Sequence, residues 1–388
     1  MMITIGWGIL LLLLIVGLRL GGIAVGLLSG LGLGLSTFWV QPAAPPHDLM
    51  LLQATWLLLM ATLETAGFFY LLKNKFSAFL EKFNHGYSLF ILLLCYGLVF
   101  LTGDKKWLCR SLCEENRPDT SKARLIVALE VAAHMGLLVS PLSMSGMFLI
   151  IVAGNSGLPI LNLLGMMVAI TIGITVASSL LVALIPEQWL DKLSAGFKDC
   201  SKEDIQVLPV SKDNVQLIFL LLLLSELLFL LIKPQSNRLT ELSCIQKIFP
   251  VRFPMFFSLV MLAIGALVML SCKIRPAQIL QTSRFKLGMQ QFFIFLGLTW
   301  LLNTLISYDK VYLTQILDGM RPSYLFYLVA GLCMLLIDLP ILIWLFSPLL
   351  IAHHSTILTL AVWLVFIHSL APIRYCIIQI VQAHKKSR

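Results

Sequence analysis

Two polar side chains within one apolar stretch, Glu130 and His134, have the types and the spacing for proton transfer. They are four residues apart, so a helix would place them on one face. Histidine titrates near neutral pH, and an acid within a membrane span is costly unless it has a partner. The pair therefore predicts either a proton relay or a structural hydrogen bond. A second histidine at the spacing of a metalloprotease helix is missing, so no metal site is predicted.

A proline and three serines interrupt the same apolar stretch, at Ser140-Pro141-Leu142-Ser143-Met144-Ser145-Gly146. We call this segment the serine break. Proline disfavours helix at the preceding residue, so the helix should end near Ser140. A helix that restarts afterwards would present free N–H groups beside hydroxyl side chains, a combination that binds anions. We predict that Ser140, Ser143 and Ser145 bind an anionic substrate inside the protein; the alternative is an exposed loop between two ordinary spans.

Two arginines lie next to proposed helix breaks. Arg124 precedes the helix that leads into the serine break, and Arg374 follows a late Ala-Pro pair. Because a guanidinium can bind a carboxylate through two parallel hydrogen bonds, both are candidates for substrate binding. Arg374 could instead extend to the membrane interface.

Two acids add to the candidates for cation or proton coupling. Glu64 lies within the third apolar run, where it should face other helices rather than lipid. Asp338 precedes a proline late in the chain and would either bind a cation or cap a half-helix. With Glu130 and His134, these residues form the predicted coupling set.

Composition identifies the protein class. Hydrophobic residues make up 59% of the 388 residues and charged residues 12%, against about 45–50% and about 25% in soluble domains. Apolar runs of about 18 residues recur along the chain and predict an all-α, multi-pass membrane protein with about ten or eleven crossings, some broken by proline. The runs are 3–18, 23–40, 49–72, 87–101, 125–139, 158–185, 215–232, 253–272, 287–307, 324–346 and 349–381.

Charge suggests how these spans are arranged. The net charge of +9 comes from basic loops, which is typical of cytoplasm-facing surfaces and needs no nucleic acid as partner. The loop 41–48 has no Lys or Arg and is predicted outside, and the loop 73–82 inside. The polar stretches 104–122 and 273–286 are predicted to be solvated. A polar linker, 187–214, separates two proposed halves, 1–186 and 215–388.

Glycines in the second apolar run predict close helix packing. Gly26, Gly30 and Gly34 recur every four residues and would lie on one helix face. Small residues at this spacing allow two helix backbones to approach each other.

An ordered set of short motifs resembles the anaerobic four-carbon dicarboxylate (Dcu) transporter family over roughly residues 4–380. The motifs are Arg19-Leu20-Gly21-Gly22-Ile23, Ala66-Gly67, Thr102-Gly103, Ser140-Pro141-Leu142-Ser143, Phe285-Lys286-x-Gly288-Met289 and Leu296-Gly297-x-x-Trp300-Leu301-x-x-Thr304. The chain departs from the family pattern at Asp104-Lys105, where the family has Asn or His, and at Asn303, where it has Asp. The resemblance therefore indicates a diverged member, shortened at its C-terminus.

The resemblance implies a secondary transporter in the bacterial inner membrane that exchanges or takes up fumarate, succinate, malate or aspartate. It adds Thr304 to the candidates for substrate binding. No cofactor is expected; the partners are dicarboxylate anions, the lipid bilayer and either a second copy or a membrane sensor protein. The alternative is a non-transporting relative that acts as an interaction or sensing partner. An enzyme is disfavoured because no nucleophile set, phosphate loop or metal cluster occurs.

Overall fold

Every regular element in the described part of the chain is a helix, as predicted for an all-α membrane protein. The structure, a computed structural model, describes residues 2–21, 23–82, 89–105, 107–108, 119–143, 146–147, 160–184 and 253–309, with the isolated positions 218, 220–222 and 315. The helices are α1 (Met2–Leu20), α2 (Ala24–Ser36), α3 (His47–Thr65), α4 (Phe68–Lys82), α5 (Leu89–Thr102), α7 (Asp119–Val139), α9 (Ile160–Leu184), α13 (Phe253–Ser271), α14 (Pro276–Gln281) and α15 (Ser283–Tyr308).

Two described helices, α9 from residue 162 onward and α15, are long and apolar enough to cross a membrane. The pair α3 and α4 meets the same criteria jointly but is bent by 62°. Four shorter apolar helices, α1, α2, α5 and α13, accompany them. The total of ten or eleven crossings depends on segments outside the described residues and stays a prediction, as does the division at 187–214.

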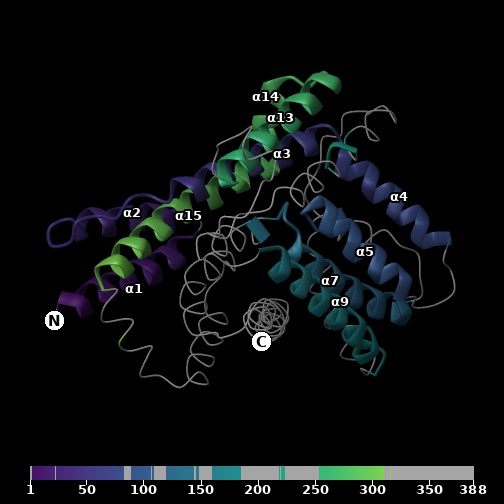
Figure 1. Cartoon of the computed structure of the whole chain (residues 1–388), viewed down its shortest axis with the longest axis horizontal. Coiled ribbons are helices and arrows are strands. Elements are labelled where there is room, and N and C mark those ends of the chain that lie inside the picture. The colour runs from purple at the N-terminus through teal and green to yellow at the C-terminus, as the bar shows by residue number, and fades with distance from the viewer. Residues whose placement is uncertain are drawn as a thin grey trace, which may run out of the picture.

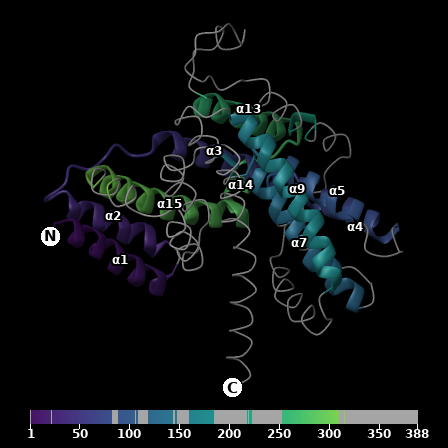
Figure 2. The same ribbon diagram turned by 60° about the horizontal axis from the view of Figure 1, so that its bottom comes forward.

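The helices form two groups, which lie apart in Figure 1 and overlap in the view of Figure 2. In the first group α1, α2 and α15 lie side by side, and α3, α13 and α14 pack at the other end of α15. In the second group α5, α7 and α9 pack on one another. Helix α4 continues from α3 towards the second group, where Phe76 contacts Trp107 edge to face at 5.5 Å between ring centroids.

Backbone contact between α2 and α15 depends on glycine. A Cβ atom on Gly26 or on Gly297 would overlap the backbone of the facing helix. The predicted glycine seam is therefore confirmed at Gly26 but wrong at Gly30 and Gly34, which are exposed and where an added Cβ atom would meet no described residue of another helix within 4 Å. Gly32 is packed instead: a Cβ atom there would meet the side chains of Leu13, on α1, and of Leu301, on α15.

Hydrogen bonds, rather than the ion pairs described below for its other end, fasten the C-terminal end of α15. The indole Nε1 of Trp300 donates to the carbonyl of Ala43, at 2.7 Å, and the Ala43 N–H donates to Oγ1 of Thr304, at 3.1 Å. Nε1 of Trp7, on α1, donates to Oδ2 of Asp309, at 2.8 Å. These bonds tie the α2–α3 connection and α1 to one end of α15.

The predicted third span, 49–72, is not one straight helix. It is interrupted at Ala66–Gly67, where Gly67 has φ +74°, a backbone conformation that favours glycine. The predicted basic loop, 73–82, is also wrong, because all of these residues lie on α4. Apolar side chains on one face of α4, such as Phe76 and Leu80, are buried and stabilise this helix against the rest of the protein.

Candidate functional site

The ends of several helices meet at one place between the two groups. Helices α3, α5 and α7 end there, and α15 begins there. Helix α5 ends at Thr102, and Gly103, directly after it, has φ +62°. A Cβ at this position would lie 2.6 Å from the carbonyl oxygen of Leu142, so only glycine lets the end of α5 approach the serine break this closely.

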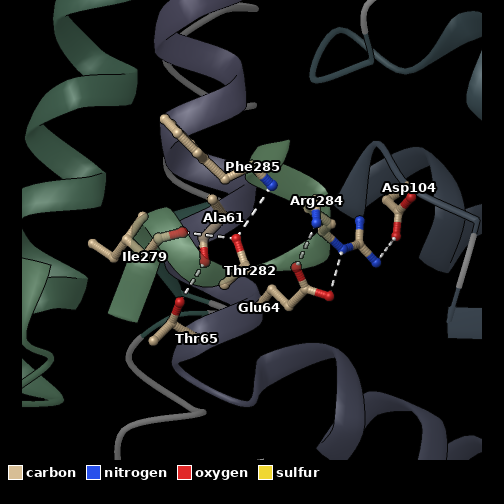
Figure 3. A network of polar contacts seen from close by, with 8 residues as sticks. All are labelled: Ala61, Glu64, Thr65, Asp104, Ile279, Thr282, Arg284 and Phe285. Atoms are coloured by element: carbon tan, nitrogen blue, oxygen red, sulfur yellow. Dashed lines mark hydrogen bonds and ion pairs between the residues drawn. The ribbon is translucent and has the colours of Figure 1, made fainter. Parts of the chain in front are cut away.

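Arg284, in the first turn of α15, is the centre of this region (Figure 3). Its Nη2 lies 2.7 Å from Oδ2 of Asp104, and its Nε lies 3.5 Å from Oε1 of Glu64. The three side chains are only 12%, 11% and 9% exposed. The guanidinium carbon also lies 4.1 Å from the ring centroid of Phe69, a cation–π contact. The arginine is thus held by two carboxylates and one aromatic face.

Local sequence explains why α15 begins here. Thr282 has extended backbone, and its Oγ1 accepts a hydrogen bond from the N–H of Phe285, at 3.2 Å, which is the bond of an N-cap residue. The N–H of Arg284, the residue before Phe285, has no acceptor within the helix and donates to Oε2 of Glu64, at 3.3 Å. A helix N-terminus carries partial positive charge, so the Glu64 carboxylate is stabilised there by the helix dipole as well as by the guanidinium.

A third ion pair adjoins the two of Arg284. The Lys105 ammonium pairs with the carboxylate of Glu130, on α7, whose side chain is 6% exposed. The carbonyl of Asp104 accepts hydrogen bonds from Nε1 of Trp107, at 2.8 Å, and from Oγ1 of Thr102, at 3.2 Å. The prediction that the stretch beginning at residue 104 is solvated is therefore wrong for its first residues. The burial of these residues costs little free energy because their charges are paired and their backbone groups are hydrogen-bonded.

The serine break has the geometry that the sequence predicts. Helix α7 ends at Val139, and Gly146 and Met147 are again helical. Oγ of Ser143 accepts a hydrogen bond from the N–H of Gly146, at 3.0 Å, so Ser143 caps the restarted helix. Ser140 and Ser143 are 0% and 1% exposed, which excludes the exposed-loop alternative for these two serines.

The Oγ of Ser140 is a buried hydroxyl that makes no hydrogen bond within the described part of the chain. A buried polar group without a partner costs about 1–3 kcal/mol. Such a group next to a helix break is a candidate contact for a ligand.

Other predicted site residues lie elsewhere. Arg124 precedes Ser140 by sixteen residues on α7, about 24 Å along one helix. Thr304 follows Arg284 by twenty residues on α15, about 30 Å along the axis. His134 is half-buried on α7, on which Glu130 pairs with Lys105. Ser145, Arg374 and Asp338 lie outside the described residues.

Sequence reasoning missed Arg284 and Asp104. Arg284 was assigned to a solvated basic stretch, because the apolar run that predicts the span begins at Leu287. One local signal was present: Thr282 precedes the span at the position of an N-cap, which would have extended the helix over Arg284. Asp104 had no such signal, since only contact with Arg284 makes its burial favourable.

Comparison with known proteins gives the same family as the sequence motifs. The family described as anaerobic C4-dicarboxylate membrane transporter matches residues 2–361. The chain belongs to this family. The C4-dicarboxylate transporter DcuA of Escherichia coli (strain K12) is 25% identical over 312 residues, which cover 77% of this chain and 70% of DcuA.

A second member of the family, the anaerobic C4-dicarboxylate transporter DcuB of Escherichia coli O6:H1, is 26% identical over 360 residues. These cover 84% of this chain and 76% of DcuB. DcuA of Shigella flexneri matches to the same extent as DcuA of E. coli K12. No solved structure matches the chain. Membership of a membrane transporter family agrees with the helical fold and the apolar helices described above.

Proposed function

We propose that this chain is a secondary transporter that moves C4-dicarboxylates across the bacterial inner membrane, by antiport or by cation-coupled uptake. Family membership and the printed names of the relatives support the substrate class, with fumarate, succinate, malate and aspartate as the candidates. The structural observation that supports it most is the burial of Ser140 and Ser143. Leu142, between them, lies against Gly103, and the next residue, Asp104, pairs with Arg284 of α15.

The chemistry of this region suits an anion. A dicarboxylate must lose much of its hydration shell inside a protein, and N–H groups, hydroxyls and a guanidinium can replace that water. Ser143 caps a restarted helix, and the buried hydroxyl of Ser140 can donate to a carboxylate oxygen. Ser145, Arg124 and Arg374 remain proposed substrate contacts.

Coupling to a cation or proton would involve the buried acids. Glu64 and Glu130 each lie beside a basic side chain, Arg284 and Lys105 respectively. If a substrate anion draws the Arg284 or Lys105 side chain away, the acid left behind is stabilised when it binds a proton or a metal cation, because an unpaired buried charge is costly. His134 and Asp338 complete the proposed coupling set.

The proposed topology follows the charge pattern of the loops. The loop 41–48 lies outside and residues 73–82 lie on the cytoplasmic side of a multi-pass protein with two halves. Single cysteines in the first segment should react with an impermeant thiol reagent added to intact cells lacking an outer membrane barrier. Labelling only at 73–82 would contradict this orientation.

The decisive experiment is counterflow in proteoliposomes that contain the purified chain. Vesicles loaded with unlabelled succinate should transiently accumulate external radiolabelled fumarate above the level in vesicles loaded with a monocarboxylate. The matched control is the same lipid without protein. If no dicarboxylate load drives accumulation by protein that elutes as a single folded species, the transport function is wrong.

The second candidate is a non-transporting relative that acts as a membrane interaction or sensing partner. One observation favours it. The protein's own acids, Glu64 and Asp104, already occupy two edges of Arg284. Dicarboxylate binding without counterflow would favour this function over transport.

A further inference from the structure

We propose that one carboxylate of the substrate replaces Asp104 on Arg284, and that this exchange breaks an ion pair that joins the two helix groups. The inference rests on the proposed dicarboxylate specificity. It adds Arg284 as a substrate contact, Asp104 as a competitor of the substrate, and loss of the Arg284–Asp104 ion pair as the structural consequence. Arg284 would be the substrate-binding arginine. When no substrate is bound, the Asp104 carboxylate would occupy the position of the substrate carboxylate on Arg284.

The contacts of Arg284 leave an edge for a carboxylate. A guanidinium has five N–H donors, and carboxylates bind best across two adjacent nitrogens. Here Nε faces Glu64, and Nη2 faces Asp104 through one oxygen. Nη1 makes no ion pair or hydrogen bond with the described residues. A carboxylate that binds Nη1 and Nη2 together gains two bonds where Asp104 has one.

The competitor and the substrate are chemically alike. The aspartate side chain ends in a CH₂–COO⁻ group, and so does each half of succinate. Replacement of Asp104 therefore exchanges one carboxylate for another on the same cation and leaves no uncompensated guanidinium. The displaced Asp104 side chain, which is 11% exposed, becomes neutral by binding a proton, because an unpaired buried charge is costly. Glu64 can keep its contacts with Nε and with the backbone N–H of Arg284, so the arginine stays in place during the exchange.

The neighbourhood of Asp104 provides contacts for the rest of the substrate. Gly103, the preceding residue, lies against Leu142 of the serine break. The buried hydroxyl of Ser140 is two residues from Leu142 and has no partner in the described part of the chain. A dianion with one carboxylate on Arg284 would thus have a hydroxyl donor from a second helix end nearby.

The exchange has a consequence for the two groups. Arg284 belongs to α15 of the first group, and Asp104 follows α5 of the second group. Two other ion pairs described here, Arg284–Glu64 and Lys105–Glu130, each lie within one group. Substrate binding would therefore remove the charge contact between groups while preserving the contacts inside each, which is what rocking of one bundle against another requires.

Succinate binding to the purified full-length chain in detergent, measured by calorimetry, tests this inference. Arg284→Lys should weaken binding about tenfold or more, because an ammonium cannot reproduce the two-nitrogen contact. Asp104→Asn should strengthen binding severalfold, since a neutral carboxamide competes poorly for the guanidinium. The backbone carbonyl of Asp104, which accepts from Trp107 and Thr102, is unchanged by this substitution.

Matched controls separate direct competition from a change in charge. Arg275→Lys changes an exposed arginine in the same way, and Asp309→Asn removes a buried acid at the far end of α15. Both should bind succinate within about twofold of the unsubstituted chain. In the double variant D104N/R284K the gain from Asp104→Asn should disappear, because the two residues act on one contact.

Three results would overturn the inference. Unchanged binding by Arg284→Lys would remove the arginine from the site. Weaker binding by Asp104→Asn in a protein that still elutes as one species would make Asp104 a positioning residue rather than a competitor. Absence of succinate, fumarate, malate and aspartate binding by the unsubstituted chain would reject the proposed function itself, together with this inference.

Discussion

The two ends of α15 are held in opposite ways. At the C-terminal end, Trp300 and Thr304 make uncharged hydrogen bonds to Ala43 of the α2–α3 connection. At the N-terminal end, Arg284 is held by carboxylates from two other helix ends. The C-terminal end, where the Asp309 carboxylate also accepts from Trp7, has no ion pair among the described residues, and we call it the neutral end. The charged end lies about 30 Å away along the helix.

The difference indicates which end can respond to an anion. A dicarboxylate offers the same group that Glu64 and Asp104 already present to Arg284, so it can compete at the charged end. It cannot replace an indole N–H or a backbone carbonyl at the neutral end. We infer that the neutral end fixes α15 within the first group and that the charged end is the part that substrate can alter.

The largest effect is expected when the charged end loses its cation. Arg284→Met leaves Glu64 and Asp104 buried without their partner, and loss of one member of a buried pair costs about 3–5 kcal/mol. The midpoint of thermal unfolding in detergent should fall strongly, whereas Arg275→Met, at an exposed position, should change it little.

Adding Glu64→Gln and Asp104→Asn to Arg284→Met should restore most of the unfolding midpoint, because no buried charge is then unpaired. Succinate binding should stay absent in this triple variant. If the single Arg284→Met variant is as stable as the unsubstituted chain, the ion pairs contribute nothing and the comparison between the two ends fails.

The second effect concerns packing along α15 between its ends. Gly26→Ala places a Cβ against the backbone of α15 and should cost about 1–3 kcal/mol. Gly30→Ala, four residues away on an open face, should be neutral or stabilising by up to about 1 kcal/mol, because alanine favours helix. Thermal unfolding of both variants checks this, and equal midpoints would contradict the described α2–α15 contact.

A smaller effect is expected at the neutral end. Thr304→Val keeps the shape of the side chain but removes the acceptor for the Ala43 N–H, which should cost about 1 kcal/mol. Succinate affinity should be unchanged if Thr304 attaches the loop rather than binding substrate. A tenfold loss of affinity with unchanged stability would return Thr304 to the substrate site.

The smallest effect on stability is expected at Ser140. Its hydroxyl is buried without a partner in the described part of the chain, so Ser140→Ala should leave the unfolding midpoint unchanged or raise it, by no more than about 1 kcal/mol. Succinate affinity should fall at the same time. Parallel loss of stability and affinity would instead indicate a structural hydroxyl.

Much of the fold could be predicted from the sequence. The apolar runs predict the observed helices closely: 3–18 becomes α1, 158–185 becomes α9 and 253–272 becomes α13. The end of α7 before Pro141 also follows from local chemistry, as does the capping role of Ser143. These features depend on neighbours in the chain, so hydrophobicity, proline geometry and hydroxyl capping suffice to place them.

The centre of the candidate site could not be predicted in this way. Glu64 and Arg284 are 220 residues apart, and each looks, in sequence, like an isolated charge. Asp104 begins a polar stretch that reads as solvated until its partner is known. The sequence alone determined most of the apolar helices and the end of α7 before Pro141, but not the helix over residues 73–82 or the start of α15 at Ser283. Only the tertiary structure decided which of the stopped ends meet, because a charge is buried favourably only when packing brings its counter-ion within contact distance.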